Sequence, residues 1–132
     1  MSDSLLNKTQ VRDFTFSALK SRRPSLAVKM TRIGEEYYLK IEARLRAKIV
    51  NEGQAADGGD LKTLRPKEPV ARPAELEWLI NQSNVRDYAL KVMNGTTLTQ
   101  IAGDYADACD LYLRKVIESY LDSMPSVGKT IN

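Results

Sequence analysis

Two segments of the chain carry large apolar residues at a strict four-residue spacing. These residues are Ile33, Tyr37, Ile41, Leu45 and Ile49 in the first segment, and Ile101, Tyr105, Cys109, Leu113 and Ile117 in the second. A β-strand alternates with a period of two, so this spacing predicts α-helices. Four residues turn a helix by about 400°, so the apolar stripe drifts around the surface and suits a partner that crosses obliquely. We therefore expect two long central helices.

The two stripes belong to a longer internal repeat. The second stripe follows the first by 68 positions, and residues 7–14 match residues 81–88 at an offset of 74, with four of eight positions identical. Downstream, Lys62-Thr63-Leu64 matches Lys129-Thr130-Ile131. The three blocks occur in the same order in both halves. The sequence therefore predicts two copies of one unit: a short helix, an extended segment, a long helix, and a loop carrying Lys-Thr-aliphatic.

Caps and prolines define the first copy. Asn7 followed by Gln10 resembles a helix cap, which predicts a short helix that Pro24 ends. Residues 25–33 should be extended, because apolar and polar residues alternate there. The long helix should begin near Gly34.

Glycines and prolines predict the connecting segments. We expect a tail or an apolar latch over residues 1–6, a loop over 51–60, a short strand over 61–64, a stiff Pro-rich connector over 65–73 and a short amphipathic helix over 74–80. The second copy should have its short helix over 84–93, a turn at Asn94-Gly95 and its long helix over 100–122, ended by Pro125.

Composition favours a soluble globular protein, with 42% apolar and 28% charged residues in a chain of 132. The net charge of +3 conceals an asymmetry. Residues 1–74 hold 15 Lys and Arg against 9 Asp and Glu, whereas residues 75–132 hold 5 against 8. A basic half suggests a surface for a polyanion, with the acidic half turned away from it. An ordinary solvated surface is the alternative that charge alone leaves open.

Several classes of function are not expected. No run approaches the ~18 apolar residues of a membrane span, and the first residues lack a basic signal-peptide start. The single Cys excludes an internal disulfide, and the absence of His removes the commonest metal ligand and general base. Gly128-Lys129-Thr130 lacks the first glycine and the following helix of a phosphate loop. We therefore predict an intracellular protein that is no enzyme, with no cofactor, no metal, no membrane association and no small-molecule substrate.

Some polar and reactive residues have a structural explanation. Tyr37, Tyr105 and Cys109 lie on the apolar stripes, so we expect them in the core. Asp104, Asp107 and Asp110 share one helical face, which is typical of a solvated acidic surface; a bound cation or a basic partner is the alternative.

Three blocks together resemble the histone-fold family, namely Val11–Phe14, Met30–Tyr37 and Leu61–Pro66. The last block resembles the Lys-Thr-Val loop of a histone. The resemblance is to small archaeal, bacterial or viral histone-like proteins, fused as a doublet on one chain. It implies an all-α fold in which two tandem helix–loop–long helix–loop units, residues 1–73 and 74–132, share one core as an intramolecular handshake.

The resemblance also implies a function. A histone-like doublet would bind double-stranded DNA without reading its sequence and would compact it, as a nucleoid or chromatin component in the cytoplasm or inside a virus-infected cell. The expected DNA-binding residues are Arg12, Lys20, Arg22, Arg23, Lys29, Arg32, Lys62, Thr63, Arg65, Lys129 and Thr130. Further association of such pseudo-dimers is left open. The alternative function is a protein-interaction module or small regulator that uses the same scaffold without binding DNA.

Overall fold

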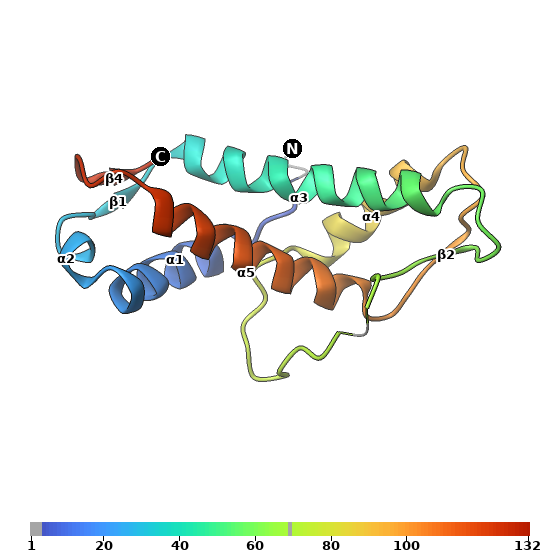
Figure 1. Cartoon of the computed structure of the whole chain (residues 1–132), viewed down its shortest axis with the longest axis horizontal. Helices are drawn as coiled ribbons and strands as arrows, with labels where there is room; N and C mark the ends of the chain where they lie inside the picture. Colours follow the sequence, from blue (N-terminus) through green and yellow to red (C-terminus); the bar gives the residue numbers. More distant parts are fainter. Residues whose placement is uncertain (1–3, 69) are drawn as a thin grey trace.

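A computed structural model of the chain describes residues 4–68 and 70–132 (Figure 1). Within these residues there are five helices and four two-residue strands. In chain order they are α1 (Lys8–Arg22), α2 (Pro24–Ala27), β1 (Arg32–Ile33), α3 (Glu35–Ala56), β2 (Thr63–Leu64), α4 (Gln82–Met93), β3 (Gln100–Ile101), α5 (Tyr105–Ser123) and β4 (Thr130–Ile131). The predicted all-α class is confirmed. The expected tail at residues 1–3 and Pro69 of the connector lie outside the described residues.

The two short helices, α1 and α4, begin in the same way. The side chain of Asn7 accepts the backbone N–H of Gln10 at 3.4 Å, and Asn81 accepts that of Asn84 at 3.1 Å. Each cap satisfies one of the N–H groups that a helix start leaves without a partner. The predicted starts of both short helices are therefore confirmed to within a few residues.

The two long helices, α3 and α5, bury the apolar stripes that predict them. Their stripe residues from Tyr37 to Ile49 and from Tyr105 to Ile117 are at most 1% exposed. The first residue of each stripe lies outside its helix, because Ile33 belongs to β1 and Ile101 to β3. The second long helix thus begins at Tyr105, whereas the sequence predicted that it begins at residue 100.

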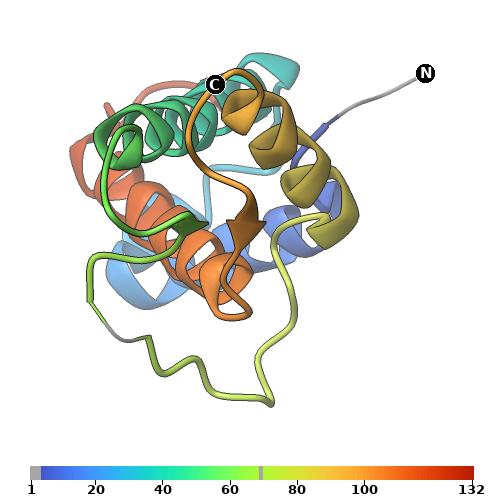
Figure 2. The ribbon, with the colours of Figure 1, turned by 90° about the vertical axis from the view of Figure 1, so that its right-hand side faces the viewer.

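The helices of the two repeats pack reciprocally. α3 and α5 run in opposite directions and contact each other (Figure 1). α1 contacts α5, the long helix of the other repeat, and α4 contacts α3. Seen along the long axis, the helices surround one interior, and the connector between β2 and α4 loops away from it (Figure 2). Both repeats therefore contribute to a single core.

Two parallel strand pairs join the repeats at opposite ends of the molecule (Figure 1). β1 pairs with β4, which places Arg32 opposite Thr130, and β2 pairs with β3, which places Thr63 opposite Gln100. The bordering hydrogen bonds also repeat. The carbonyl of Lys129 accepts the N–H of Thr31 at 2.8 Å, and that of Lys62 accepts the N–H of Thr99 at 2.7 Å. Each Lys-Thr loop is thus held by the extended segment of the other repeat.

The starts of the two repeats are also paired with each other. Leu6 and Ile80 form an antiparallel bridge, the N–H of Asn7 donates to the carbonyl of Leu79, and the N–H of Asn81 donates to the carbonyl of Leu5, both at 2.8 Å. Leu5 and Leu6 are 1% and 5% exposed, so the apolar latch is the correct alternative for these residues. The repeat therefore extends upstream to Leu5-Leu6-Asn7 and Leu79-Ile80-Asn81.

Two of the predicted segments are wrong. Residues 24–27 form α2 with Pro24 at its start, where proline is favourable, so the segment 25–33 is not extended throughout. Leu26 and Met30 are buried while Val28 is 80% exposed, a four-residue spacing that the alternation concealed. Residues 74–80 are not a helix, because their backbone groups bond to the start of the chain and to α5.

The predicted loop over residues 51–60 is also wrong in its first part, since α3 continues to Ala56. Gly53, taken as a sign of a loop, is a packing residue. A Cβ placed on it would lie 2.6 Å from Cγ1 of Val92 on α4. The glycine therefore lets α4 approach α3 closely, and the helix continues past it.

None of the helices in residues 4–68 and 70–132 is long and apolar enough to cross a membrane.

Candidate nucleic-acid interface

One end of the molecule is strongly basic. We call residues 20–34 and 124–132, which meet at the β1–β4 pair, the basic end. These two segments contain no Asp or Glu, and their cations are Lys20, Arg22, Arg23, Lys29, Arg32 and Lys129. The strand register places Arg32 opposite Thr130, directly after Lys129. The side chains of Lys29, Arg32 and Lys129 are exposed. Seven of the predicted site residues, from two segments far apart in the sequence, thus lie in the basic end.

Arg22 turns its guanidinium group toward α5. Its Nε and Nη2 atoms bond to the two carboxylate oxygens of Asp122 at 2.8 and 2.5 Å, and Nη1 lies 3.8 Å from Glu118. The hydrogen bond with Arg22 lowers the pKa of Asp122, and the same bond raises the pKa of Arg22. Because its charge is matched, Arg22 contributes less to an anion surface than its position suggests.

Arg23 is held by the C-terminal end of α5. Its Nη1 atom donates to the carbonyls of Leu121 at 2.8 Å and Met124 at 2.6 Å, and Nη2 donates to the Ser126 hydroxyl at 2.9 Å. The contact satisfies carbonyls that a helix end leaves without partners. Among the residues that the structure describes, no carboxylate forms an ion pair with Arg23, in contrast to Arg22.

The opposite end has the same strand pairing with different chemistry. We call residues 57–65 and 94–102, which meet at the β2–β3 pair, the neutral end. It holds the predicted residues Lys62, Thr63 and Arg65, which Asp57 and Asp60 balance, and residues 94–102 carry no charge. Asp57 also accepts the N–H of Thr97 at 2.9 Å. Of the predicted DNA-binding residues, seven therefore lie in the basic end and three in the neutral end.

The remaining predicted residue, Arg12, lies on α1 outside both ends. Its side chain is exposed, as is that of Lys20 nearer the end of the same helix. Arg86, the residue of α4 that matches Arg12 in the repeat, is exposed as well. Sequence reasoning passed over Arg86, although it lies in the block that defines the repeat.

Each long helix carries a carboxylate–arginine pair that the sequence analysis missed. Arg46 bonds to Glu42 at 2.6 Å and stacks on Tyr88 of α4 at 4.7 Å. At the matching positions, Arg114 bonds to Asp110 at 3.1 Å and stacks on Phe14 of α1 at 4.9 Å. Both arginines use cation–π contacts to fix a short helix of the other repeat. The signal was available as an acid followed four residues later by Arg at the 68-residue offset.

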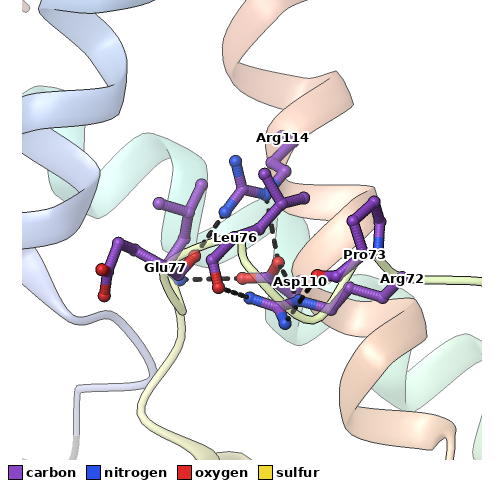
Figure 3. A network of polar contacts seen from close by, with 7 residues as sticks. Arg72, Pro73, Leu76, Glu77, Asp110 and Arg114 are labelled. Atoms are coloured by element: carbon purple, nitrogen blue, oxygen red, sulfur yellow. Dashed lines mark hydrogen bonds and ion pairs between the residues drawn. The ribbon is translucent and has the colours of Figure 1, made fainter.

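Asp110 also anchors the connector to α5 (Figure 3). Its oxygens accept the Nε of Arg72 and the N–H of Leu79, each at 2.8 Å, and Arg114 donates to the carbonyl of Glu77. The guanidinium of Arg72 stacks on Trp78, with 3.7 Å from Cζ to the ring centroid. Asp110 is 0% exposed. The prediction that it belongs to a solvated acidic face is therefore wrong, because three donors surround it.

The stripe tyrosines and the cysteine are core residues, as predicted. The hydroxyl of Tyr37 lies 2.8 Å from that of Thr15, and the hydroxyl of Tyr105 donates to Glu52 at 2.8 Å. Burial raises the pKa of both tyrosines and raises the pKa of Cys109 to about 12. Cys109 therefore stays a thiol at neutral pH, and only the thiolate is strongly nucleophilic.

Residues 4–68 and 70–132 contain no group of three or more His, Cys, Asp or Glu side chains arranged to hold a metal ion. Comparison of the chain with known protein families, with characterised proteins and with solved structures found no match.

Proposed function

We propose that the chain is a histone-like doublet in which two repeats fold around each other in a handshake. Three reciprocal features support this proposal. Each short helix lies against the long helix of the other repeat, each Lys-Thr loop pairs with the extended segment of the other repeat, and the two starts bridge each other. An ordinary helical bundle would have no reason to repeat its loop pairing across the two halves.

The proposed function is binding to double-stranded DNA without sequence recognition, chiefly through the basic end. The observation that carries it is the β1–β4 pair, which gathers Lys29, Arg32, Lys129 and Thr130 on segments free of Asp and Glu. Ammonium, guanidinium and hydroxyl groups are the usual protein contacts to DNA phosphates, and such contacts carry no sequence information. An arginine beside a loop can also enter a narrow minor groove. On this proposal the chain is a DNA-associated protein of the cytoplasm or of a virus-infected cell, and it acts without catalysis or a cofactor.

The test is the affinity for a random-sequence duplex, measured by fluorescence anisotropy over a series of salt concentrations. Binding to phosphates releases counterions, so log K should fall linearly with log salt, with a slope of about −0.9 per phosphate contact. With about four contacts at the basic end, the slope should lie near −4. A flat salt dependence, or no binding at low salt, overturns the proposal. A second duplex of different sequence is the control for sequence recognition.

The alternative function is a protein-interaction module on the same scaffold. The charge of residues 75–132, with 5 Lys and Arg against 8 Asp and Glu, is the observation that favours it. Such a surface would attract a basic partner and repel DNA. A chain that fails to bind duplex DNA at low salt yet keeps its fold would move the proposal to this class.

A further inference from the structure

The basic end contains a hollow of about 290 Å³, and none of the residues that line it belongs to the β1–β4 strand pair. It is lined by Arg23, Pro24, Ser25, Leu26, Lys29 and Ser126. Four of these six side chains can donate a hydrogen bond, and no carboxylate lines the hollow. The lining comes from the segment between α1 and β1 and from the loop before β4. The hollow therefore exists only when the two halves of the chain are folded together.

Three hydrogen bonds hold Arg23 in the lining of this hollow. Of its five N–H donors, two go to the carbonyls of Leu121 and Met124 and one to the hydroxyl of Ser126. Two donors keep no acceptor among the residues that the structure describes. The three bonds fix the guanidinium group, so binding an anion would cost little further side-chain entropy.

The other donors surround Arg23 without competing acceptors. The hydroxyl of Ser126 accepts from Arg23, so its own proton is available for a second bond. Lys29 and Ser25 are exposed side chains in the same lining. The carboxylate of Asp122, near the end of α5, is bound on both oxygens by Arg22. Donors without acceptors, two of them on cations, match a phosphate group and not a cation or an apolar ligand.

The neutral end lacks an equivalent site. At the offset of 74, Arg23 corresponds to Thr97, which bonds to Asp57 through its N–H and to the N–H of Gly58 through its hydroxyl. At the offset of 67, Ser126 corresponds to Gly59, which has no side chain to donate. The neutral end has a hollow of its own, of about 450 Å³, whose donors are Lys91, Asn94, Thr96 and Thr99, but it holds one cation and no arginine. The combination of Arg23 with Lys29 is therefore a property of the chemistry of the basic end and not of the repeated fold.

We propose that this hollow binds one phosphate group, with Arg23 and Lys29 supplying charge and Ser25 and Ser126 supplying hydroxyl donors. The proposal rests on the proposed function in one respect, because it takes the phosphate to be one of the DNA backbone. A small free phosphate compound shares the same chemistry and is the other source. One phosphate seated there would fix the register of the duplex across the basic end.

The first experiment uses duplex DNA and two variants of the intact chain. Ser25→Ala with Ser126→Ala removes both hydroxyls, and with them one of the three bonds that hold Arg23, but leaves its bonds to the carbonyls of Leu121 and Met124. Lys29→Ala removes one cation and leaves all three bonds of Arg23 in place. We expect the Lys29→Ala variant to reduce the steepness of log K against log salt by about one, and the serine pair to weaken binding at every salt concentration. Lys115→Ala, an exposed lysine on α5, is the matched control and should leave the slope unchanged.

The second experiment titrates pyrophosphate at constant ionic strength and follows the backbone amide signals of Ser25 and Ser126 by NMR. Saturable shifts that the serine pair abolishes support the hollow even if DNA does not bind, in which case only the proposed function falls. A different result is a Lys29 variant that binds DNA with an unchanged slope of log K against log salt, with no saturable NMR shift on adding pyrophosphate. This result would contradict phosphate binding in the hollow and would leave the proposed function intact. Saturable shifts with unchanged DNA binding in both variants contradict the DNA phosphate and assign the site to a small phosphate compound.

Discussion

The two ends of this molecule have the same strand pairing and different chemistry. At both ends a Lys-Thr loop of one repeat pairs in parallel with the extended segment of the other. At the basic end the surrounding segments hold six Lys and Arg and no acid, whereas at the neutral end two cations face two carboxylates. The comparison teaches that the repeated fold and the proposed DNA contact are separate properties. Hydrophobic pairing maintains the fold at both ends, and charge distinguishes one end from the other.

The two carboxylate–arginine pairs differ in the same way. Asp110 is completely buried and binds the connector, whereas the side chain of Glu42 is 14% exposed. Removing one member of a buried ion pair leaves the other charge without compensation. The same substitution should therefore have unequal effects in the two repeats.

The largest expected effect is on stability and follows from this difference. Asp110→Ala leaves Arg72, whose side chain is 3% exposed, without its carboxylate, and should lower the free energy of unfolding by about 3–5 kcal/mol. Glu42→Ala, the matching change, should cost about 1 kcal/mol, because Arg46 is nearer the solvent. Urea unfolding followed by circular dichroism measures both. Equal losses of unfolding free energy in the two variants would contradict the role of Asp110 in holding the connector against α5.

The next effect separates the two ends as DNA surfaces. Changing Lys29, Arg32 and Lys129 together to Ala should reduce the steepness of the salt dependence by about three and bring random-duplex affinity close to zero at moderate salt. Lys62→Ala with Arg65→Ala, at the neutral end, should change it by less than half as much, because Asp57 and Asp60 already oppose these cations. Anisotropy with the same duplex serves both variants. A greater loss of affinity in the neutral-end variant would place the DNA interface at the neutral end and contradict the proposal.

A smaller effect tests whether helix packing differs between the repeats. Gly53 on α3 accepts Val92 of α4, whereas the matching positions are Leu121 on α5 and Ala18 on α1. Gly53→Leu should therefore overpack the contact and cost about 1–3 kcal/mol. Adding Val92→Ala copies the arrangement of the other repeat and should recover most of the loss. Double-mutant unfolding measures the coupling, and purely additive losses would count against equivalent helix crossings.

The smallest effect is a pH dependence. The folded chain lowers the pKa of Asp122 through its bond to Arg22, so this pair stabilises the fold above the ordinary aspartate pKa of 3.8. The contribution is lost as the pH falls through the lower folded pKa. Both side chains are exposed, so the effect should be small and should fade in high salt. Asp122→Asn should unfold at a urea midpoint that varies less between neutral and acidic pH than that of the parent chain.

Much of the fold was predictable from sequence because the repeat is carried by buried residues. Tyr37 and Tyr105 begin equivalent buried stripes, and Asn7 and Asn81 cap equivalent helices, so periodicity and capping were sufficient. The failures have tertiary causes. Gly53 is helical because α4 needs its space, and residues 74–80 are irregular because Leu79 bonds to Asn7 and to Asp110. The pattern of neighbouring residues in the sequence does not reveal such distant partners.

The candidate interface was predictable in its residue types and not in its distribution. The Lys-Thr blocks identified both loops, and the charge count identified the basic half. The contacts of Arg22 with Asp122 and of Arg23 with Leu121 join positions about 100 residues apart, so sequence reasoning could not assign their partners. The hollow at Ser126 depends on the same long-range folding. Pairing of distant segments decides which cations remain available.

The central claim, that the two strand pairs are equivalent and that the charge around them decides where DNA binds, is tested most directly by giving the neutral end a cation. Gln100 occupies the position of Arg32 and lies opposite Thr63 as Arg32 lies opposite Thr130. The slope of log K against log salt should become steeper by about one in the Gln100→Arg variant, since one more phosphate is contacted. An unchanged slope in a variant that remains folded would contradict the account.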